Sequence, residues 1–236
     1  MTDLLAEDIN DAGQVVGRMG TSAVLWQNGS VTNLGSLGGA GGWATAINNA
    51  GQVVGYSYEQ SDHHAFLWHD GAMQDLGTGV ANGINSYGHV VGESTSSTGG
   101  AVLWQGGALI NLNGSALGSQ ASDINDAGQI VGQQFRLGEL IHATMWDNGS
   151  TIDLGSLGSA SMAEAINNHG EVVGLAIVSG RWHAFVWKSG VGMQDLNTLI
   201  GPNWGGNFLE RPISTIWGRS SVVVSINTTS RYAPSC

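Results

Sequence analysis

The sequence predicts an all-β protein, a β-propeller of short four-stranded antiparallel blades with about 40 residues per repeat. Three observations support this fold class. A signature of the form Ile-Asn-x-x-Gly-x-Val/Ile-Val-Gly occurs five times, and turn residues divide each copy into four short apolar runs. The second run carries adjacent apolar residues, which is typical of a strand covered on both faces. The signatures begin at Ile9, Ile47, Ile84, Ile124 and Ile166, which are 38, 37, 40 and 42 residues apart.

The second copy shows the four runs most clearly. They read Ala-Thr-Ala-Ile-Asn at 44–48, Gly-Gln-Val-Val-Gly at 51–55, His-Ala-Phe-Leu-Trp at 64–68 and Met-Gln-Asp-Leu-Gly at 73–77. A glycine stands at one offset before each second run, which predicts a left-handed backbone position there. These glycines are Gly13, Gly51, Gly88, Gly128 and Gly170.

The third and fourth runs are joined by pairs that suit tight hairpins, because both central residues can take positive φ. The pairs are Asn28-Gly29, Asp70-Gly71, Gly106-Gly107, Asn148-Gly149 and Ser189-Gly190. An elongated β-solenoid is the alternative architecture. Its coils are usually shorter and would need no tight hairpin in each repeat, so we favour the propeller.

The chain divides into a repeat domain over residues 1–200 and a tail without the signature over 201–236. We place the repeats at about 6–43, 44–80, 81–120, 121–162 and 163–200, in a ring that five copies need not complete. Residues 1–4, Met-Thr-Asp-Leu, match the fourth run of a repeat, so we expect the chain to start inside a preceding copy. A back-translation of 213–225 in a shifted frame restores the signature, and we hypothesise a frameshifted remnant of a sixth repeat. An ordinary divergent tail is the alternative.

The composition limits the classes of partner that we expect. The net charge is −11 and the seven Lys and Arg residues form no cluster, so we expect neither nucleic acid nor an anionic membrane as a partner. No apolar run is long enough to insert in a membrane, and this chain carries no signal-peptide layout. The single Cys236 excludes an intrachain disulfide.

The recurring motifs resemble those of the HAF repeat family of bacterial extracellular repeat proteins. The shared pattern is Ala-x-x-Ile-Asn-x-x-Gly-x-Val-Val-Gly, then His-Ala-Phe-x-Trp, then Met-x-Asp-Leu-Gly, and it covers residues 1 to about 200. The name-giving tripeptide stands at 64–66 and 183–185, reads His-Ala-Thr at 142–144 and is replaced in the other two copies. The resemblance implies an exported propeller-like protein at or beyond the cell surface. It implies no catalytic residues.

Recurring polar residues can be interpreted as metal ligands or as residues that hold the backbone. The residues His64, His142 and His183 share one place in their copies, but Ser22 and Gly100 stand there in the others, so a symmetric metal ring is incomplete. We favour strand-edge histidines bonded to a neighbouring blade. The signature asparagines Asn10, Asn48, Asn85, Asn125 and Asn167 open loops that partly match a calcium motif at Asp8 and Asp123. We interpret them instead as caps of the turn, and we expect no metal.

Aromatic residues also fall into two groups. The recurring third-run residues Trp26, Trp68, Trp104, Trp146 and Trp187 indicate packing between blades. In contrast, Trp43 and Trp182 recur in no other copy and lie in predicted loops. They are the first candidates for ligand contact, with His64 and His183 beside them.

Enzyme motifs are not found in the sequence, and the recurring acids Asp75, Asp153 and Asp195 suit a turn that ends the fourth run. We therefore expect a non-enzymatic extracellular binding or structural module without a cofactor, whose partner is a protein or a glycan. One alternative is a glycan-active propeller enzyme that uses loop acids such as Asp62 and Glu93. The other is the fragment of a disrupted gene, whose open ring would expose an apolar blade face and associate with itself.

Overall fold

The structure is a computed structural model that describes residues 3–59, 62–96, 99–112, 118–135 and 140–199. The tail from 201 to 236, with both hypotheses about its origin, lies outside the described residues.

Nineteen strands and one helical turn follow each other in the described ranges. The first blade contains β1 (Leu4–Ile9), β2 (Val15–Met19), β3 (Ser22–Gln27) and β4 (Ser30–Gly35). The second contains β5 (Gly41–Ile47), β6 (Val53–Glu59), β7 (Asp62–His69) and the start of β8 (Ala72–Ile84). The third continues with the end of β8, then β9 (Val90–Ser94), β10 (Gly100–Gln105) and β11 (Ala108–Asn111).

Two further blades complete the described part. The fourth blade contains β12 (Ser119–Ile124), β13 (Ile130–Gln134), β14 (His142–Asp147) and β15 (Ser150–Gly155). The fifth contains β16 (Ser161–Ile166), β17 (Val172–Val178), β18 (Arg181–Lys188) and β19 (Gly192–Asp195), and α1 (Leu196–Leu199) follows it.

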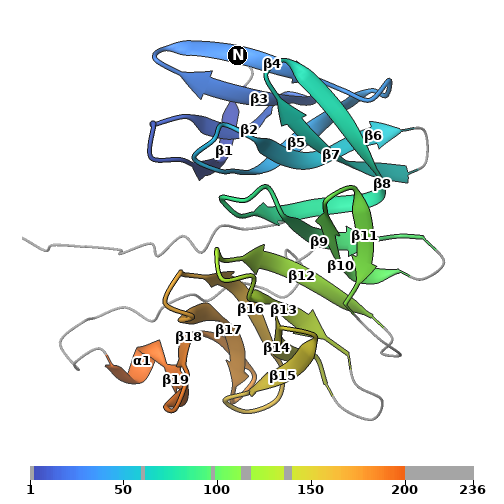
Figure 1. The fold of residues 1–236 in the computed structure, drawn as a ribbon. Coiled ribbons are helices and arrows are strands. Elements are labelled where there is room, and N and C mark those ends of the chain that lie inside the picture. Colours follow the sequence, from blue (N-terminus) through green and yellow to red (C-terminus); the bar gives the residue numbers. More distant parts are fainter. Residues whose placement is uncertain (1–2, 60–61, 97–98, 113–117, 136–139, 200–236) are drawn as a thin grey trace, which may run out of the picture.

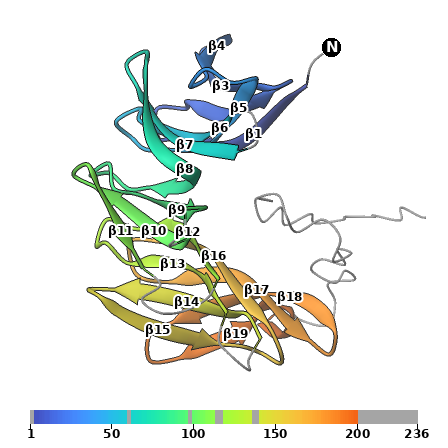
Figure 2. The ribbon, with the colours of Figure 1, turned by 90° about the vertical axis from the view of Figure 1, so that its right-hand side faces the viewer.

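Each blade is an antiparallel meander in which consecutive strands pair. The long strand β8 belongs to two blades, because residues 72–78 pair with β7 and residues 79–84 pair with β9. The five blades follow each other along an arc, with blade 1 at one end and blade 5 at the other (Figures 1 and 2). The predicted all-β propeller class is confirmed. Within the described ranges no sheet joins the first blade to the fifth, so hydrogen bonds do not close the ring.

In the three inner blades, the adjacent apolar residues of the second strand serve two different interfaces. In blade 2, Val53 packs in a cluster with residues of blade 1, whereas Val54 packs in a cluster with residues of blade 3. The same division holds in blade 3 for Val90 and Val91. Both members of such a pair are buried because the strand lies between two blades, which is why the sequence does not alternate there.

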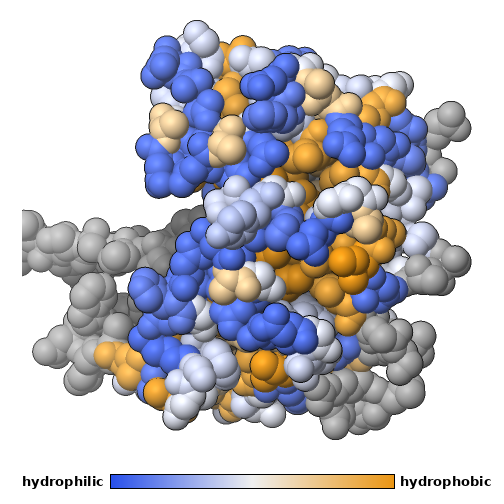
Figure 3. All heavy atoms as spheres, viewed as in Figure 1, coloured by the Kyte–Doolittle hydropathy of each residue, from blue (hydrophilic) through white to orange (hydrophobic). Residues whose placement is uncertain are grey.

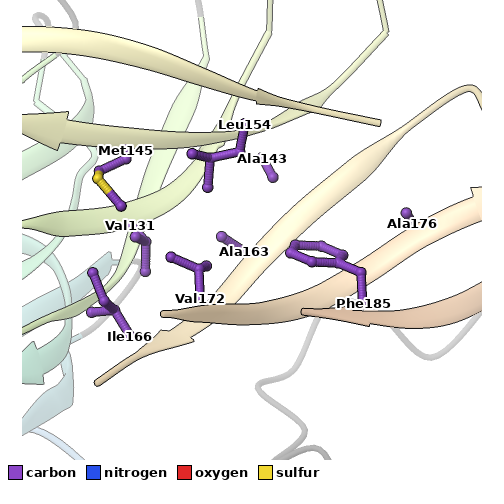
Figure 4. Close-up of a cluster of buried hydrophobic side chains, with 9 residues drawn as sticks. All are labelled: Val131, Ala143, Met145, Leu154, Ala163, Ile166, Val172, Ala176 and Phe185. Carbon is purple, nitrogen blue, oxygen red and sulfur yellow. The ribbon is translucent and has the colours of Figure 1, made fainter. Parts of the chain in front are cut away.

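The interface between blades 4 and 5 shows the packing in full (Figure 4). Blade 4 contributes Val131, Ala143, Met145 and Leu154, and blade 5 contributes Ala163, Ile166, Val172, Ala176 and Phe185. Phe185 and Val172 are completely buried. Removing such side chains from water is the dominant source of stability in a protein with so few charges.

A β-bulge in each first strand explains the glycine that ends the Val-Val-Gly motif. In blade 2 the register of β5 against β6 shifts between Ala44 and Ala46. The bulge directs the carbonyl of Trp43 at Gly55, where a Cβ atom would overlap the carbonyl oxygen. Equivalent overlaps exist at Gly17, Gly92, Gly132 and Gly174. The glycine is therefore required by close approach of two backbones and not by its φ angle.

The turns follow the hairpin chemistry in four of the five blades. Asn28 has φ 50° and Gly29 has φ 80°, and the Asp-Gly, Gly-Gly and second Asn-Gly pairs behave alike. The expectation of a two-residue hairpin at Ser189-Gly190 is wrong. There Lys188 pairs with Gly192 across a three-residue loop, and the positive φ angles fall on Gly190 and Gly192.

Hydrophobic residues also reach the surface. They gather over β10 and β11 in the middle of the face that Figure 3 shows. The outer strand β11 contributes Leu109 and Ile110, which are 50% and 42% exposed. No helix in the described part of the chain is long and apolar enough to cross a membrane.

Candidate functional site

The signature asparagines close the turn between the first and second strands of every blade. In blade 2 the Asn48 Oδ1 atom accepts hydrogen bonds from the backbone N–H groups of Ala50 and Gln52, at 3.1 and 3.0 Å. The Nδ2 group donates to the Gln52 Oε1 atom at 2.7 Å. Asparagine suits this place because one short side chain can accept from two backbone donors two and four residues ahead.

The same asparagines also connect successive blades. The Nδ2 group of Asn10 donates to the carbonyl of Asn48 at 3.1 Å, and that of Asn48 donates to the carbonyl of Asn85 at 3.0 Å. Two further bonds continue the series, from Asn85 to Asn125 at 3.2 Å and from Asn125 to Asn167 at 3.1 Å. We call this series the asparagine ladder. It runs in one direction along the arc, each blade donating to the next.

The acids of the partial calcium motif bond to the next blade instead of surrounding a cation. The Asp8 Oδ2 atom accepts from the Ile47 N–H at 2.8 Å, and the Asp123 Oδ2 atom accepts from the Ile166 N–H at 3.0 Å. No group of three or more acidic, histidine or cysteine side chains that could hold a metal occurs within the residues that the structure describes. Calcium would need six or more oxygen ligands.

The recurring histidines pair with the recurring acids of the fourth strand. The Nδ1–Oδ2 distances are 3.1 Å for His64 with Asp75, 3.1 Å for His142 with Asp153 and 2.7 Å for His183 with Asp195. Each pair lies within one blade, so the expected bond to a neighbouring blade is wrong. The reason is that the first residue of the tripeptide lies opposite the end of its own fourth strand.

Each of these acids has a second task at the end of the fourth strand. The Asp75 Oδ1 atom accepts from the Gly77 N–H at 2.7 Å, and Asp153 and Asp195 make the same bond two residues ahead. Burial opposes ionisation of Asp195, but the bonds from His183 and Asn197 outweigh it and lower the pKa of that carboxyl. Both oxygens of these acids therefore make bonds within the local structure. Each histidine–aspartate pair joins the third strand of its blade to the fourth, a structural role that this geometry suits better than proton transfer, and we call these pairs the histidine–aspartate clamps.

The recurring third-strand tryptophans pack against the preceding blade. Trp68 lies against the cluster between blades 1 and 2, and Trp187 lies against the cluster between blades 4 and 5. Trp104 and Trp146 are 7% and 4% exposed. The Trp104 Nε1 atom donates to the Leu76 carbonyl of blade 2 at 2.9 Å. Trp26, in the first blade, is half-buried, as are Trp68 and Trp187.

Trp43 lies in a group of aromatic rings at one edge of blade 2. The residues Trp43, Tyr56, Tyr58 and His63 form what we call the aromatic cluster. Ring centroids are 6.3 Å apart for Trp43 and Tyr56, 5.4 Å for Tyr56 and Tyr58, and 4.9 Å for Tyr56 and His63. The guanidinium carbon of Arg18, from blade 1, stands 4.2 Å from the centroid of Trp43. Burial and a hydrogen bond with Tyr58 raise the pKa of Tyr56 well above its usual value.

Sequence reasoning placed Trp43 and Trp182 in loops, and both placements are wrong. Trp43 is the third residue of β5 and Trp182 is the second residue of β18. Both rings are half-buried, and each Nε1 atom is buried without a hydrogen-bond partner in the described part of the chain. The prediction began these strands at the recurring motifs, at Ala44 and at His183, whereas the strands begin at Gly41 and at Arg181.

The aromatic cluster is specific to the second blade. The residues that pair at the places of Trp43 and Tyr56 are Leu5 and Arg18 in blade 1, Val80 and Glu93 in blade 3, Gln120 and Gln133 in blade 4, and Met162 and Leu175 in blade 5. Sequence reasoning missed the tyrosines because they recur in no other copy. The signal that could have found them is the Tyr-x-Tyr pair directly after the recurring Val-Val-Gly, which no other copy shows.

The loop acids of the enzyme alternative lie in strands. Asp62 is the first residue of β7, beside His63, and Glu93 belongs to β9. Glu93 occupies the place in blade 3 that Tyr56 occupies in blade 2. Burial raises the pKa of its carboxyl. The structure thus places both acids toward the edge that carries the aromatic cluster, in neighbouring blades.

Comparison with solved structures identifies the fold. The chain is similar to TolB from Acinetobacter baumannii, with a TM-score of 0.57 and 13% identity over 80% of this chain and 52% of TolB. It is similar to the β-propeller domain of the Trilobed protease from Pyrococcus furiosus, described as an open velcro topology, with a TM-score of 0.56 and 13% identity over 82% and 69% of the two chains. The tricorn protease matches with a TM-score of 0.55 and 14% identity over 83% of this chain and 22% of that one.

These similarities show a β-propeller fold and nothing finer, because identity is so low. The chain spans about half the length of TolB. No protein-family model and no curated relative matches the sequence.

Proposed function

We propose that this protein is a non-enzymatic, extracellular binding module that uses the aromatic cluster of blade 2 to hold a neutral glycan. The observation that carries the proposal is the contrast between recurring and unique residues. Recurring residues make the asparagine ladder, the histidine–aspartate clamps and the packing between blades. The aromatic cluster is absent from the other four described blades, so blade architecture does not require it.

The chemistry of the cluster favours a sugar. Aromatic faces bind the C–H faces of sugar rings, and His63 is exposed while Trp43, Tyr56 and Tyr58 are half-buried. The acids Glu59 and Asp62 end and begin the strands at this edge, and their carboxylates can accept hydrogen bonds from sugar hydroxyl groups. A surface with acids and a net charge of −11 disfavours an anionic polymer.

A binding experiment tests this function. The purified chain is applied to immobilised neutral polysaccharides, and affinities are measured for the wild type and for Tyr58→Ala and His63→Ala. Loss of one stacking ring should weaken binding about three- to tenfold. Tyr87→Ala is the matched control, because Tyr87 is 70% exposed and its ring centroid is 6.0 Å from that of His89, in the turn of another blade.

Two outcomes would contradict the proposal. One is binding that survives both cluster substitutions unchanged. The other is a wild type that binds none of the polysaccharides and binds a protein instead. The non-enzymatic role is tested separately. If the wild type turns over a polysaccharide and Asp62→Ala or Glu93→Ala abolishes that turnover, the protein is a glycan-active enzyme.

The extracellular location rests on the resemblance to the HAF repeat family. It is tested by fractionating cells that express the full gene and locating the protein with an antibody. Recovery in the cytoplasm alone would contradict it.

A further inference from the structure

The two ends of the described arc expose opposite faces of the same repeated interface. The first-strand isoleucine faces the preceding blade, and Ile47, Ile84, Ile124 and Ile166 are between 5% and 9% exposed. Ile9, in the first blade, is 62% exposed. Ala6 is also exposed, although the equivalent Ala44 and Ala81 are completely buried.

Blade 5 exposes the complementary face. The second valine of each pair faces the next blade, and Val16, Val54, Val91 and Val131 are completely buried. Val173 is 37% exposed. Ala165 and Asn167 are exposed beside it, whereas their equivalents in blade 2, Ala46 and Asn48, are 8% and 6% exposed.

The asparagine ladder is also complementary at its two ends. The carbonyl of Asn48 accepts two bonds, from Gly51 N–H and from the Nδ2 group of Asn10. The carbonyl of Asn10 accepts from Gly13 N–H, and no described blade precedes it to supply the second donor. At the far end the Nδ2 group of Asn167 makes only the local bond, to the Glu171 carboxylate, that Asn48 makes to Gln52, and no described blade follows to supply the carbonyl acceptor.

A second set of hydrogen bonds has the same direction. The Asp11 N–H donates to the Asn49 Oδ1 atom at 2.9 Å, and the Asp126 N–H donates to the Asn168 Oδ1 atom at 2.9 Å. The Ser86 N–H makes the same bond to the Asp126 Oδ1 atom, so at three of the four blade interfaces a turn offers a backbone donor to a side chain of the following blade. In the last described blade, Asn168 occupies the position of the backbone N–H donor. In the first blade, Asp11 occupies the position of the side-chain acceptor.

We infer that the exposed face of blade 5 binds the exposed face of blade 1 of a second copy of this chain, head to tail. This contact would continue an interface that the chain already forms four times, with the same valine, isoleucine and asparagine positions. A contact between two different faces leaves a free face of each kind on the pair. Such a contact closes into a ring of copies or extends into a filament, depending on its rotation.

The test uses two single substitutions in the full chain. Ile9→Asp places a charge on the blade 1 face, and Val173→Asp places one on the blade 5 face. Masses are measured by sedimentation velocity across a range of protein concentrations. The wild type should associate as concentration rises, and each variant alone should associate at least about tenfold more weakly, because a buried unpaired carboxylate is costly.

Mixing the two variants makes the test specific. Val173→Asp retains an intact blade 1 face and Ile9→Asp retains an intact blade 5 face, so an equimolar mixture should form a dimer and no larger species. Val191→Asp is the matched control, because Val191 is also 62% exposed but lies in a loop between β18 and β19. Circular dichroism of each variant checks the fold.

Three results would overturn the inference. The first is a wild type that stays monomeric at all concentrations. The second is association that Ile9→Asp and Val173→Asp weaken no more than Val191→Asp does. The third is a variant mixture that stays monomeric although both variants are folded.

Discussion

The asparagine ladder gives a quantitative prediction, because Asn48 and Asn167 make the same local bonds and differ in burial. Asn48 is 6% exposed and its side chain makes four hydrogen bonds, three within its turn and one to the Asn85 carbonyl. Asn167 is exposed and makes three bonds, to His169 N–H, Glu171 N–H and the Glu171 carboxylate. We therefore compare Asn48→Ala with Asn167→Ala.

The expected magnitudes follow from the bonds and their exposure. A typical hydrogen bond contributes about 1 kcal/mol net to stability, so Asn48→Ala should lower the free energy of unfolding by about 3 to 4 kcal/mol. Water can replace the lost partners at the exposed turn of blade 5, so Asn167→Ala should cost about 1 kcal/mol. The difference of about 2 to 3 kcal/mol measures burial and the bond between blades.

Urea unfolding followed by tryptophan fluorescence and by circular dichroism is the assay. Agreement of the two probes would show that blades unfold together, which is required before free energies are compared. The reasoning would be refuted if Asn48→Ala cost no more than Asn167→Ala. The asparagine would then only shape its own turn, and the bonds between blades would contribute nothing measurable.

Three further predictions concern single positions. Gly55→Ala should destabilise by about 3 kcal/mol in urea unfolding, because its Cβ would overlap the Trp43 carbonyl; an unchanged midpoint would contradict the bulge. Glu93→Gln should raise the melting temperature at pH 7 and have no effect below the usual glutamate pKa. Burial raises the pKa of the Glu93 carboxyl in the folded state, so the wild type loses stability as pH rises from the usual glutamate pKa through this raised pKa. Asp195→Asn should destabilise at pH 7, and the loss should shrink as pH falls through the lowered folded pKa, since the carboxylate stabilises only above it; a loss that persists at low pH would point to shape instead of charge.

Local chemistry explains why much of the architecture was predictable. Several backbone and burial requirements depend only on residues a few positions apart. Examples are the positive φ at Gly51, the Asp-Gly turn at 70–71 and the burial of the adjacent valines at 53–54. Because the unit repeats, each requirement appears five times, and chance resemblance is reduced. The partner of His64 was not predictable in this way, since which strand end lies opposite depends on the register of the fourth strand.

The aromatic cluster was only partly within reach of the sequence. Trp43 could be singled out because it does not recur, but its surroundings could not. Tyr56 lies 13 residues further along and meets Trp43 only because β5 and β6 pair with Trp43 opposite Tyr56, and Tyr58 joins the cluster through its contact with Tyr56. The contact with Arg18 needs a further condition, the stacking of blade 1 against blade 2.

The sequence by itself determined the class of fold, the repeat length and the chemistry of most turns, because these depend on residues a few positions apart. Only the tertiary structure decided which blade each side chain faces, which residues gather at the edge of blade 2, and which faces stay uncovered at the ends of the arc. Ile9 and Ile47 occupy the same position of the repeated signature, yet one is 62% exposed and the other 6%. The physical reason is that burial of a repeated residue depends on whether another blade lies against it, and the residue itself carries no information about that neighbour.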